Sequence, residues 1–368
     1  MSWTRIIVFL AVIAFLCIYL GKRYYGAART VAKRPAAMIL AAIGVALGIG
    51  FFASTIVSIS DPRPPSMLAV VFAITMPWTL YMTLGYLAID ALRLVRLRPK
   101  RPSLPREFLV LAALSCAVTA YGIWNVRAIA VRRVEILASK PDIDLKIAFV
   151  ADLHIGGPGM TPAKLEKAVA EMNAFSPDLV LLGGDIVDRR IREFADGGYD
   201  AILGGLRAKR GVYAILGNHE YYRNDIGNVM REYEKAGIAT LRDEAVDVAG
   251  IRLIGADDPA SIRFGKRPAL LRAIVRPSDG FKLLLMHNPS RQKEAEKAGA
   301  DLMLSGHTHA GQLFPISLML YAMYDTVYGY ARDGAMQVYV TSGIGIWGSP
   351  VRTAGRSEIV LLHIKSEK

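Results

Sequence analysis

The stretch Ser305-Gly306-His307-Thr308-His309-Ala310-Gly311-Gln312 follows the mostly apolar run 301–304, which predicts a short buried strand. His307 and His309 lie one residue apart on the turn that leaves this strand. Each ring can therefore direct a nitrogen towards a common point, which suits a metal centre. The stretch predicts part of such a centre, and other strand ends must supply the remaining ligands.

Histidine placement supports this interpretation. The chain contains six histidines. Five of them lie within two residues of Gly, Asn or Asp where an apolar run ends: His154, His219, His287, His307 and His309. One such histidine is most simply a hydrogen-bonded turn residue, but five placed alike indicate a single constellation. His363 lies in the last predicted strand and is interpreted as structural.

Polar residues also follow three earlier runs that predict strands, at 145–150, 179–182 and 212–216. Asp152, Asp185 and Asn218 stand at these strand ends, 33 residues apart in each step. This interval is the length of one strand and helix unit. The strand ends together supply seven oxygen and nitrogen ligands: Asp152, His154, Asp185, Asn218, His287, His307 and His309.

Oxygen and imidazole ligands without thiolate suit a borderline or hard divalent cation. Seven ligands are too many for one tetrahedral ion and suit two octahedral ions that share a carboxylate. Two ions about 3.5 to 4 Å apart can bind a phosphoryl group and activate water for in-line attack. The constellation therefore predicts metal-dependent phosphoryl chemistry.

At these residues the chain resembles the calcineurin-like metallophosphoesterase family. Five blocks match in order over about residues 145–365: D-L-H at 152, G-D-I-V-D at 184, G-N-H-E at 217, His287, and G-H-T-H at 306. The resemblance is strongest to a bacterial branch with an N-terminal membrane segment. It implies an α/β fold, a four-layer αββα sandwich over residues 143–368, and a metal-dependent phosphoric ester hydrolase.

The resemblance also implies which residues hold two divalent ions, for which Mn²⁺, Fe and Zn²⁺ are all compatible. One ion would be held by Asp152, His154, Asp185 and His309. The other would be held by Asp185, Asn218, His287 and His307, so that Asp185 bridges.

Three further site residues follow from the same matching. His219 would be the acid that protonates the leaving group, and Asp188 would orient its ring. The alternative for His219 is a structural histidine behind the ligands. Arg189 would bind phosphate, with a solvated surface residue as the alternative.

Charge divides the chain into two parts. Residues 1–142 carry 17 Lys/Arg against 5 Asp/Glu, whereas residues 143–368 carry 28 against 27. The basic residues of the first part lie in loops between apolar runs, which favours membrane insertion over nucleic-acid binding. The two cysteines, Cys17 and Cys116, lie in these runs and are not expected to form a disulfide.

Four apolar runs predict membrane helices, at 6–20, 36–58, 67–92 and 108–124. We therefore expect a four-helix transmembrane region at 1–126, a connector at 127–142 and a catalytic domain at 143–368. Lys and Arg gather in the first and third loops, which places these loops in the cytoplasm and the catalytic domain outside it, in a bacterial cell membrane. Asp90 is expected to face Arg93 at headgroup level, and no transport pathway is indicated.

Further elements complete the predicted catalytic domain. Helices are expected at 161–175, 193–209 and 291–298, a hairpin at 245–248 and 251–255, and strands at 282–286, 337–341 and 358–363.

The expected function is hydrolysis of a phosphodiester or a lipid-linked phosphate at the bilayer. Some members of the resembled family hydrolyse UDP-diacylglucosamine, but that substrate is made in the cytoplasm, so the expected topology disfavours it. A non-catalytic metal-binding sensor or scaffold is the rival from another class. The sequence does not indicate the oligomeric state.

Overall fold

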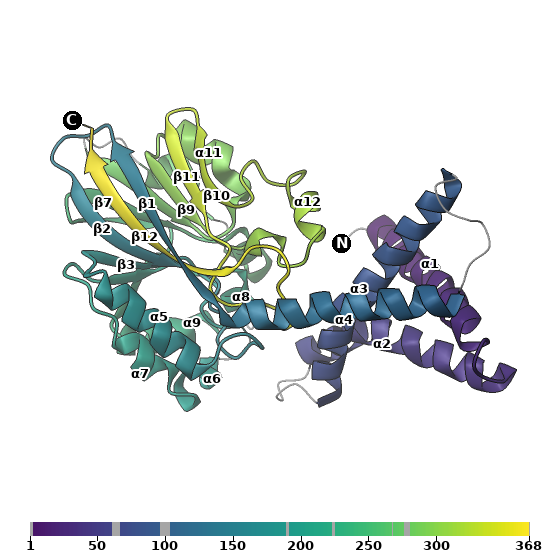
Figure 1. The fold of residues 1–368 in the computed structure, drawn as a ribbon. Coiled ribbons are helices and arrows are strands. Elements are labelled where there is room, and N and C mark those ends of the chain that lie inside the picture. Colours follow the sequence, from purple (N-terminus) through teal and green to yellow (C-terminus); the bar gives the residue numbers. More distant parts are fainter. Residues whose placement is uncertain are drawn as a thin grey trace. The chain divides into compact units, whose positions relative to one another are not determined.

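The structure, a computed structural model, describes residues 3–60, 67–95, 104–188, 191–222, 225–266, 268–275 and 280–367. The chain divides into two compact units, each visible in Figure 1. One unit comprises Met1–Ile123 with Gly348–Val351, and the other comprises Trp124–Trp347 with Arg352–Lys368. The boundary falls close to the expected end of the N-terminal region at residue 126.

Four long helices make up most of the described part of the first unit: α1 (Trp3–Ala28), α2 (Arg34–Ser60), α3 (Met67–Leu94) and α4 (Leu104–Arg127). Each contains one of the four apolar runs of the sequence. Two stretches, Ala69–Leu94 and Leu104–Arg127, are long and apolar enough to cross a membrane by length and composition. Membrane crossing by α1 and α2 stays a prediction.

Small residues let α2 approach α1 closely. A Cβ atom added at Gly44 would lie 2.7 Å from the ring of Tyr24, which is too close for any larger residue at this position.

Four charged side chains near the end of α3 are paired: Arg23, Asp90, Arg93 and Glu107. Arg93 lies 3.4 Å from the carboxylate of Asp90, as the sequence predicted. Asp90 also accepts hydrogen bonds from Arg23 and, at 2.7 Å, from the Tyr19 hydroxyl. Arg93 in turn pairs with Glu107. The charges near this end of α3 are therefore compensated within the helical unit.

The second unit contains two six-stranded sheets. The first has the order β1 (Ile129–Ala138), β12 (Ser357–Ser366), β2 (Asp144–Val150), β3 (Leu179–Leu182), β4 (Val212–Ala214) and β5 (Ile238–Thr240). The second has the order β10 (Gly329–Asp333), β11 (Met336–Val340), β9 (Leu302–Ser305), β8 (Phe281–Met286), β7 (Ile251–Ala256) and β6 (Glu244–Val248). Strands β2 to β5 run parallel, as do β7, β8, β9 and β11.

Alternation of side chains along these strands builds a layered core. Ile147 and Phe149 of β2 join Leu283 of β8 in a cluster between the two sheets. The neighbouring residues Ala148 and Val150 point the other way, into a cluster with the outer helices. A third cluster covers the outer face of the second sheet. Two sheets therefore pack face to face with helices on both outer sides.

The helices of this unit include α5 (Pro162–Ala174), α6 (Ile191–Asp196), α7 (Tyr199–Gly204), α8 (Asn218–Tyr221), α9 (Ile226–Lys235), α10 (Leu271–Ile274), α11 (Gln292–Ala298) and α12 (Ile316–Leu320). Short 3₁₀ turns occupy Pro259–Phe264, Pro289–Arg291 and His309–Gly311. Thr161 caps α5 by accepting a hydrogen bond from the Lys164 amide at 3.2 Å, and Pro162 follows at the first helical position.

Two expectations from the sequence differ from the structure. Residues 127–142, expected as a connector, contain strand β1, which pairs in parallel with β12 along its whole length. The exposed Arg132 and Arg133 obscured its apolar alternation. The single helix expected at 193–209 is divided into α6 and α7, because Gly197 and Gly198 interrupt it and Gly198 adopts a positive φ of 69°.

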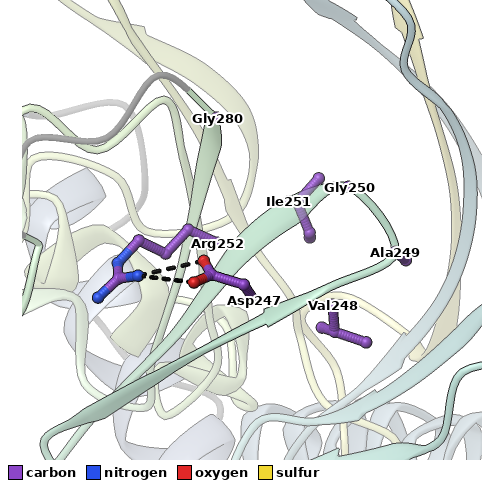
Figure 2. Close-up of a pocket in the computed structure, with 7 residues that line it drawn as sticks. All are labelled: Asp247, Val248, Ala249, Gly250, Ile251, Arg252 and Gly280. Atoms are coloured by element: carbon purple, nitrogen blue, oxygen red, sulfur yellow. Dashed lines mark hydrogen bonds and ion pairs between the residues drawn. The ribbon is translucent and has the colours of Figure 1, made fainter.

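The predicted hairpin is present as β6 and β7, and its turn is formed by Ala249 and Gly250, which both have positive φ. A hollow beside this turn is drawn in Figure 2, where Arg252 reaches both carboxylate oxygens of Asp247 at 3.1 Å. The hollow lies where β7 and β8 begin. The polar strand-end residues lie at the opposite ends of these strands.

Candidate metal centre

The seven predicted ligands lie at the carboxyl ends of strands from both sheets. Asp152 and His154 follow β2, Asp185 follows β3, Asn218 begins α8 after β4, His287 follows β8, and His307 and His309 follow β9. Parallel strands bring their carboxyl ends to the same edge of a sheet. The two sheet edges lie side by side at this point, as shown by the His307 amide, which donates to the Asp152 carboxylate at 3.0 Å.

The backbone at these positions is unusual. Five of the seven residues have positive φ although none is glycine: Asp152, His154, Asp185, His307 and His309, with values from 48° to 69°. Such conformations cost free energy, and they persist where surrounding contacts fix them, most often at functional sites.

Motif glycines permit the close approach of these loops. A Cβ atom at Gly217 would lie 2.1 Å from Oδ1 of Asp185, and one at Gly306 would lie 2.4 Å from Oδ2 of Asp152. No side chain fits at either position without displacing a carboxylate. The glycines that precede Asn218 and His307 are therefore needed for the geometry of the site.

One group of ligand atoms gathers around the end of β2. Nε2 of His154 lies 3.1 Å from Nε2 of His309, and Nε2 of His309 lies 3.4 Å from Oδ1 of Asp152. At this distance the two imidazole nitrogens can share a hydrogen-bonded proton, and a cation could take the place of that proton. All three side chains are buried, so the group can enclose a metal ion.

A second group gathers around Asp185. Its Oδ2 lies 3.1 Å from Nε2 of His287, and the ring of His307 completes the group. Nε2 of His287 thus faces the Asp185 carboxylate, and Oδ1 of Asn218 is buried without a hydrogen-bond partner. Orphaned buried acceptors of this kind are what a divalent cation would satisfy.

The Asp185 carboxylate lies between the two groups. Its Oδ2 is 3.8 Å from Nε2 of His154 on one side and 3.1 Å from Nε2 of His287 on the other. Burial alone would raise the pKa of Asp185, but His287, His219 and His154 hold its pKa well below the usual range. Asp185 is therefore a carboxylate in position to face two cations at once.

Hydrogen bonds behind the cluster fix the ligand orientations. Nδ1 of His287 lies 2.8 Å from the Gly183 carbonyl, which directs Nε2 towards Asp185. The Glu220 carboxylate accepts from the amides of Asp185, at 3.0 Å, and Gly217, at 2.8 Å. Glu220 thus joins the loops after β3 and β4.

His219 and Asp188 form a pair beside the ligands. Nδ1 of His219 lies 3.0 Å from both Oδ1 and the carbonyl oxygen of Asp188. Oδ1 of Asp188 also lies 3.0 Å from Nδ1 of His154. Burial opposes a charge on His219, but Asp185 and Asp188 raise its pKa to about 9. The two carboxylates therefore favour the doubly protonated form of the ring.

The free nitrogen of His219 faces the cluster. Nε2 lies 4.0 Å from Oδ2 of Asp185, and the side chain is only 16% exposed. His219 also lies close enough to His154 and Asp185 to act as a ligand itself. The arrangement thus admits a proton donor beside the second group, with direct ligation as the alternative. Arg189 lies outside the described residues.

Two basic side chains near the site, the buried Arg352 and the half-buried Lys164, have no place in the motifs of the sequence. Arg352 is fully buried, donates to the carbonyls of Ser342 at 2.8 Å and Gly345 at 2.7 Å, and lies 3.4 Å from Nδ1 of His309. Lys164 donates to the carbonyls of Val126, Gly159 and Ile344 and to the Ser357 hydroxyl. Neither belongs to a strand-end motif, so no pattern in the sequence distinguished them from surface residues.

Comparison with known proteins identifies the family. Residues 145–311 match the family of calcineurin-like phosphoesterases. An uncharacterized metallophosphoesterase of Aquifex aeolicus is 32% identical over 231 residues, which cover 61% of this chain and 86% of that protein. An uncharacterized metallophosphoesterase of Helicobacter pylori is 34% identical over 238 residues, which cover 64% of this chain and 63% of that protein.

A third relative carries a membrane description in its name. The transmembrane protein with metallophosphoesterase domain of Danio rerio is 32% identical over 236 residues, covering 60% of this chain and 53% of that protein. The chain therefore aligns with a little under two thirds of the Helicobacter relative and about half of the Danio relative. The matched region contains the strand-end cluster, and the Aquifex relative aligns along most of its own length, so this chain belongs to the calcineurin-like metallophosphoesterase family.

Proposed function

We propose that this protein is a membrane-anchored phosphoesterase with two divalent metal ions, acting on a phosphodiester or a lipid-linked phosphate. The observation that carries the proposal is the position of Asp185 between two groups of buried ligand atoms, 3.8 Å from Nε2 of His154 and 3.1 Å from Nε2 of His287. Family membership supports phosphoester hydrolysis as the reaction class.

The ligand assignment follows the two groups. One ion would be held by Asp152, His154, Asp185 and His309, and the other by Asp185, Asn218, His287 and His307. The orphaned Oδ1 of Asn218 is a ligand atom that this assignment satisfies. Nitrogen and oxygen ligands suit Mn²⁺, Fe and Zn²⁺ alike.

Two such ions would bind the phosphoryl group and lower the pKa of water so that it attacks phosphorus. The protein residues then provide the remaining steps. Asp188 accepts from Nδ1 of His219 and favours the doubly protonated ring, whose second proton is on Nε2 and directed towards the cluster. His219 can donate that proton to the departing oxygen, which matters because an alkoxide is a poor leaving group.

We further propose that the protein is anchored in a bacterial cell membrane, with the catalytic unit outside the cytoplasm. The two apolar helical stretches and the Danio relative's name support membrane association, and the basic loops support this orientation. Reporter fusions after residue 130 test it. Cytoplasmic behaviour of these fusions would reverse the orientation and favour a UDP-diacylglucosamine-type pyrophosphatase instead.

The activity is tested with purified full-length protein in detergent. The protein would be loaded with Mn²⁺ and assayed on a nitrophenyl phosphodiester and on a panel of lipid phosphates, with metal content measured in parallel. We expect two ions per chain and hydrolysis that a chelator abolishes. Asp196→Ala, a change at an exposed α6 residue, is the control for Asp185→Ala. Two bound ions without hydrolysis of any substrate would favour a metal-binding sensor or scaffold.

A further inference from the structure

Residues 313–324, which we call the apolar loop, directly follow the G-H-T-H-A-G-Q stretch and carry no charged side chain. Helix α12 lies within the apolar loop and contributes no buried residue. Six large side chains of the loop are exposed by 38% to 67% of their surface: Phe314, Ile316, Leu318, Met319, Tyr321 and Met323. Contiguous exposed apolar side chains on a folded unit mark an interaction surface.

Both ends of the apolar loop are attached to the metal centre. Its beginning follows the proposed ligand His309 by four residues, and Gly311, with a φ of 80°, lets the chain turn back so closely that a Cβ atom there would lie 2.3 Å from Cα of Ser317. At its end, the Tyr324 ring packs edge-on against His307 with 6.3 Å between centroids. The exposed apolar surface is therefore held beside the second group of ligands.

An aromatic side chain extends this surface at the start of the loop. Trp347 is 48% exposed. Its carbonyl accepts from the Gln312 side chain at 3.1 Å, and its amide donates back to the same side chain at 3.3 Å. Trp and Tyr side chains are enriched where proteins meet the lipid headgroup region. The aromatic residues Trp347 and Tyr321 thus give this surface the composition of a membrane-facing one.

The junction between α4 and β1 indicates what covers the surface. The apolar helix α4 ends at Arg127 and β1 begins at Ile129, so Ala128 alone joins them. One residue spans less than about 4 Å. If α4 crosses a bilayer, the catalytic unit begins at the bilayer surface, and lipid is the nearest large apolar phase.

We propose that the apolar loop inserts into the interfacial region of the bilayer in which the protein is anchored. The loop then presents the phosphate of a membrane lipid or lipid-linked molecule to the adjacent metal centre. This inference rests on the proposed membrane-anchored phosphoesterase function and narrows its substrate class to phosphoesters that lie within the bilayer.

Insertion is tested directly by fluorescence quenching in reconstituted vesicles. In a full-length protein with Cys17→Ser and Cys116→Ser, a single environment-sensitive label is attached through Leu318→Cys. The matched control is Leu137→Cys, an apolar β1 position that is 48% exposed. Residue 137 lies ten residues beyond Arg127, about 30 Å along an extended strand. Quenching is measured with spin-labelled acyl chains and with aqueous iodide.

The label at residue 318 is expected to be quenched by the acyl-chain spin label and shielded from iodide, with the reverse at residue 137. Equal behaviour at both positions would overturn the proposal. Shielding from iodide without lipid quenching would also overturn it. If that shielding increased with protein concentration, a second copy of the chain would cover the loop. If it did not, a protein segment other than a second copy would cover the loop.

Substrate delivery is tested with the acidic double variant L318D/M319D beside the control L137D. Loss of apolar insertion is expected to lower kcat/KM on a vesicle-embedded phosphoester about tenfold or more. The rate on a soluble nitrophenyl phosphodiester and the metal content should match the control. An equal rate loss on both substrates would remove the delivery role. Absence of nitrophenyl hydrolysis in the wild type would count against the phosphoesterase function alone, since the quenching result stands independently.

Discussion

The substitution Glu220→Gln is expected to destabilise the catalytic unit and weaken metal binding, although Glu220 is not a proposed ligand. The Glu220 carboxylate is buried and accepts five hydrogen bonds. Oε2 accepts from the amides of Asp185 and Gly217, and Oε1 accepts from the amides of Ile186 and Val187 and from the Tyr233 hydroxyl.

The magnitude follows from this arrangement. In glutamine one oxygen is replaced by an NH₂ group, which then faces at least two backbone N–H donors whichever way the amide is turned. Each hydrogen bond to a charged group contributes about 1.5 to 3 kcal/mol, so the loss is about 3 to 6 kcal/mol. For a unit of this size, each kcal/mol lowers Tm by about 2 to 4 °C. Tyr233→Phe removes one of the five bonds and provides the matched smaller change.

Thermal unfolding would be followed by tryptophan fluorescence in detergent after chelation, so that bound metal does not contribute. Metal content of the untreated variants would be measured separately. Glu220→Gln should melt at least 6 °C below the wild type, with a clearly smaller shift for Tyr233→Phe, and should retain less metal. Equal melting of the two variants, with two ions retained in both, would refute the proposed role of the carboxylate.

Four further predictions concern the site and its surroundings. His219→Ala should keep both ions but lose about 10²- to 10⁴-fold in rate on an alkyl ester and less on a nitrophenyl ester; metal loss with equal rate loss on both esters would make His219 a ligand. Asp185→Ala should lose metal, measured by elemental analysis against Asp196→Ala, and two retained ions would contradict the bridging assignment. Gly345→Ala should cost about 1 to 3 kcal/mol and lower metal occupancy, since its Cβ would lie 2.5 Å from the Asp152 carbonyl; unchanged melting and metal content would contradict this. Burial, with Arg352 nearby, lowers the pKa of Lys164 to about 7. The folded chain therefore binds fewer protons than the unfolded chain between about pH 7 and 10. The Tm of the wild type should rise with pH across this window, and the Tm of Lys164→Met should not.

The strand-end residues could be predicted because their positions follow from general geometry. A buried parallel strand is a short apolar run, and the polar residue after it must lie at the carboxyl edge of the sheet. Asp152, Asp185 and His287 all satisfied this pattern, and the structure brings them together. Their assignment to particular ions stays a proposal.

Other features depend on contacts between residues far apart in the chain, which no local pattern reveals. Strand β1 looked like a connector because its pairing partner, β12, lies more than 200 residues later. Arg352 looked like a surface residue because its acceptors are carbonyls that only the folded loops bring together. The break between α6 and α7 has a local cause, because Gly197 and Gly198 are poor helix formers and Gly198 adopts a positive φ.

The position of β12 between β1 and β2 has a consequence for biosynthesis. Strands β1 and β2 are synthesised early, but the edge of each strand that pairs with β12 stays unpaired until β12 has been synthesised. During that interval the nascent chain presents unpaired strand edges, which are prone to associate with other chains. Non-local pairing of this kind also slows folding, because a long loop must close first. Chaperone dependence and aggregation on overexpression should therefore be sensitive to residues 357–366, and a premature stop before them should yield protein that collects in the insoluble fraction.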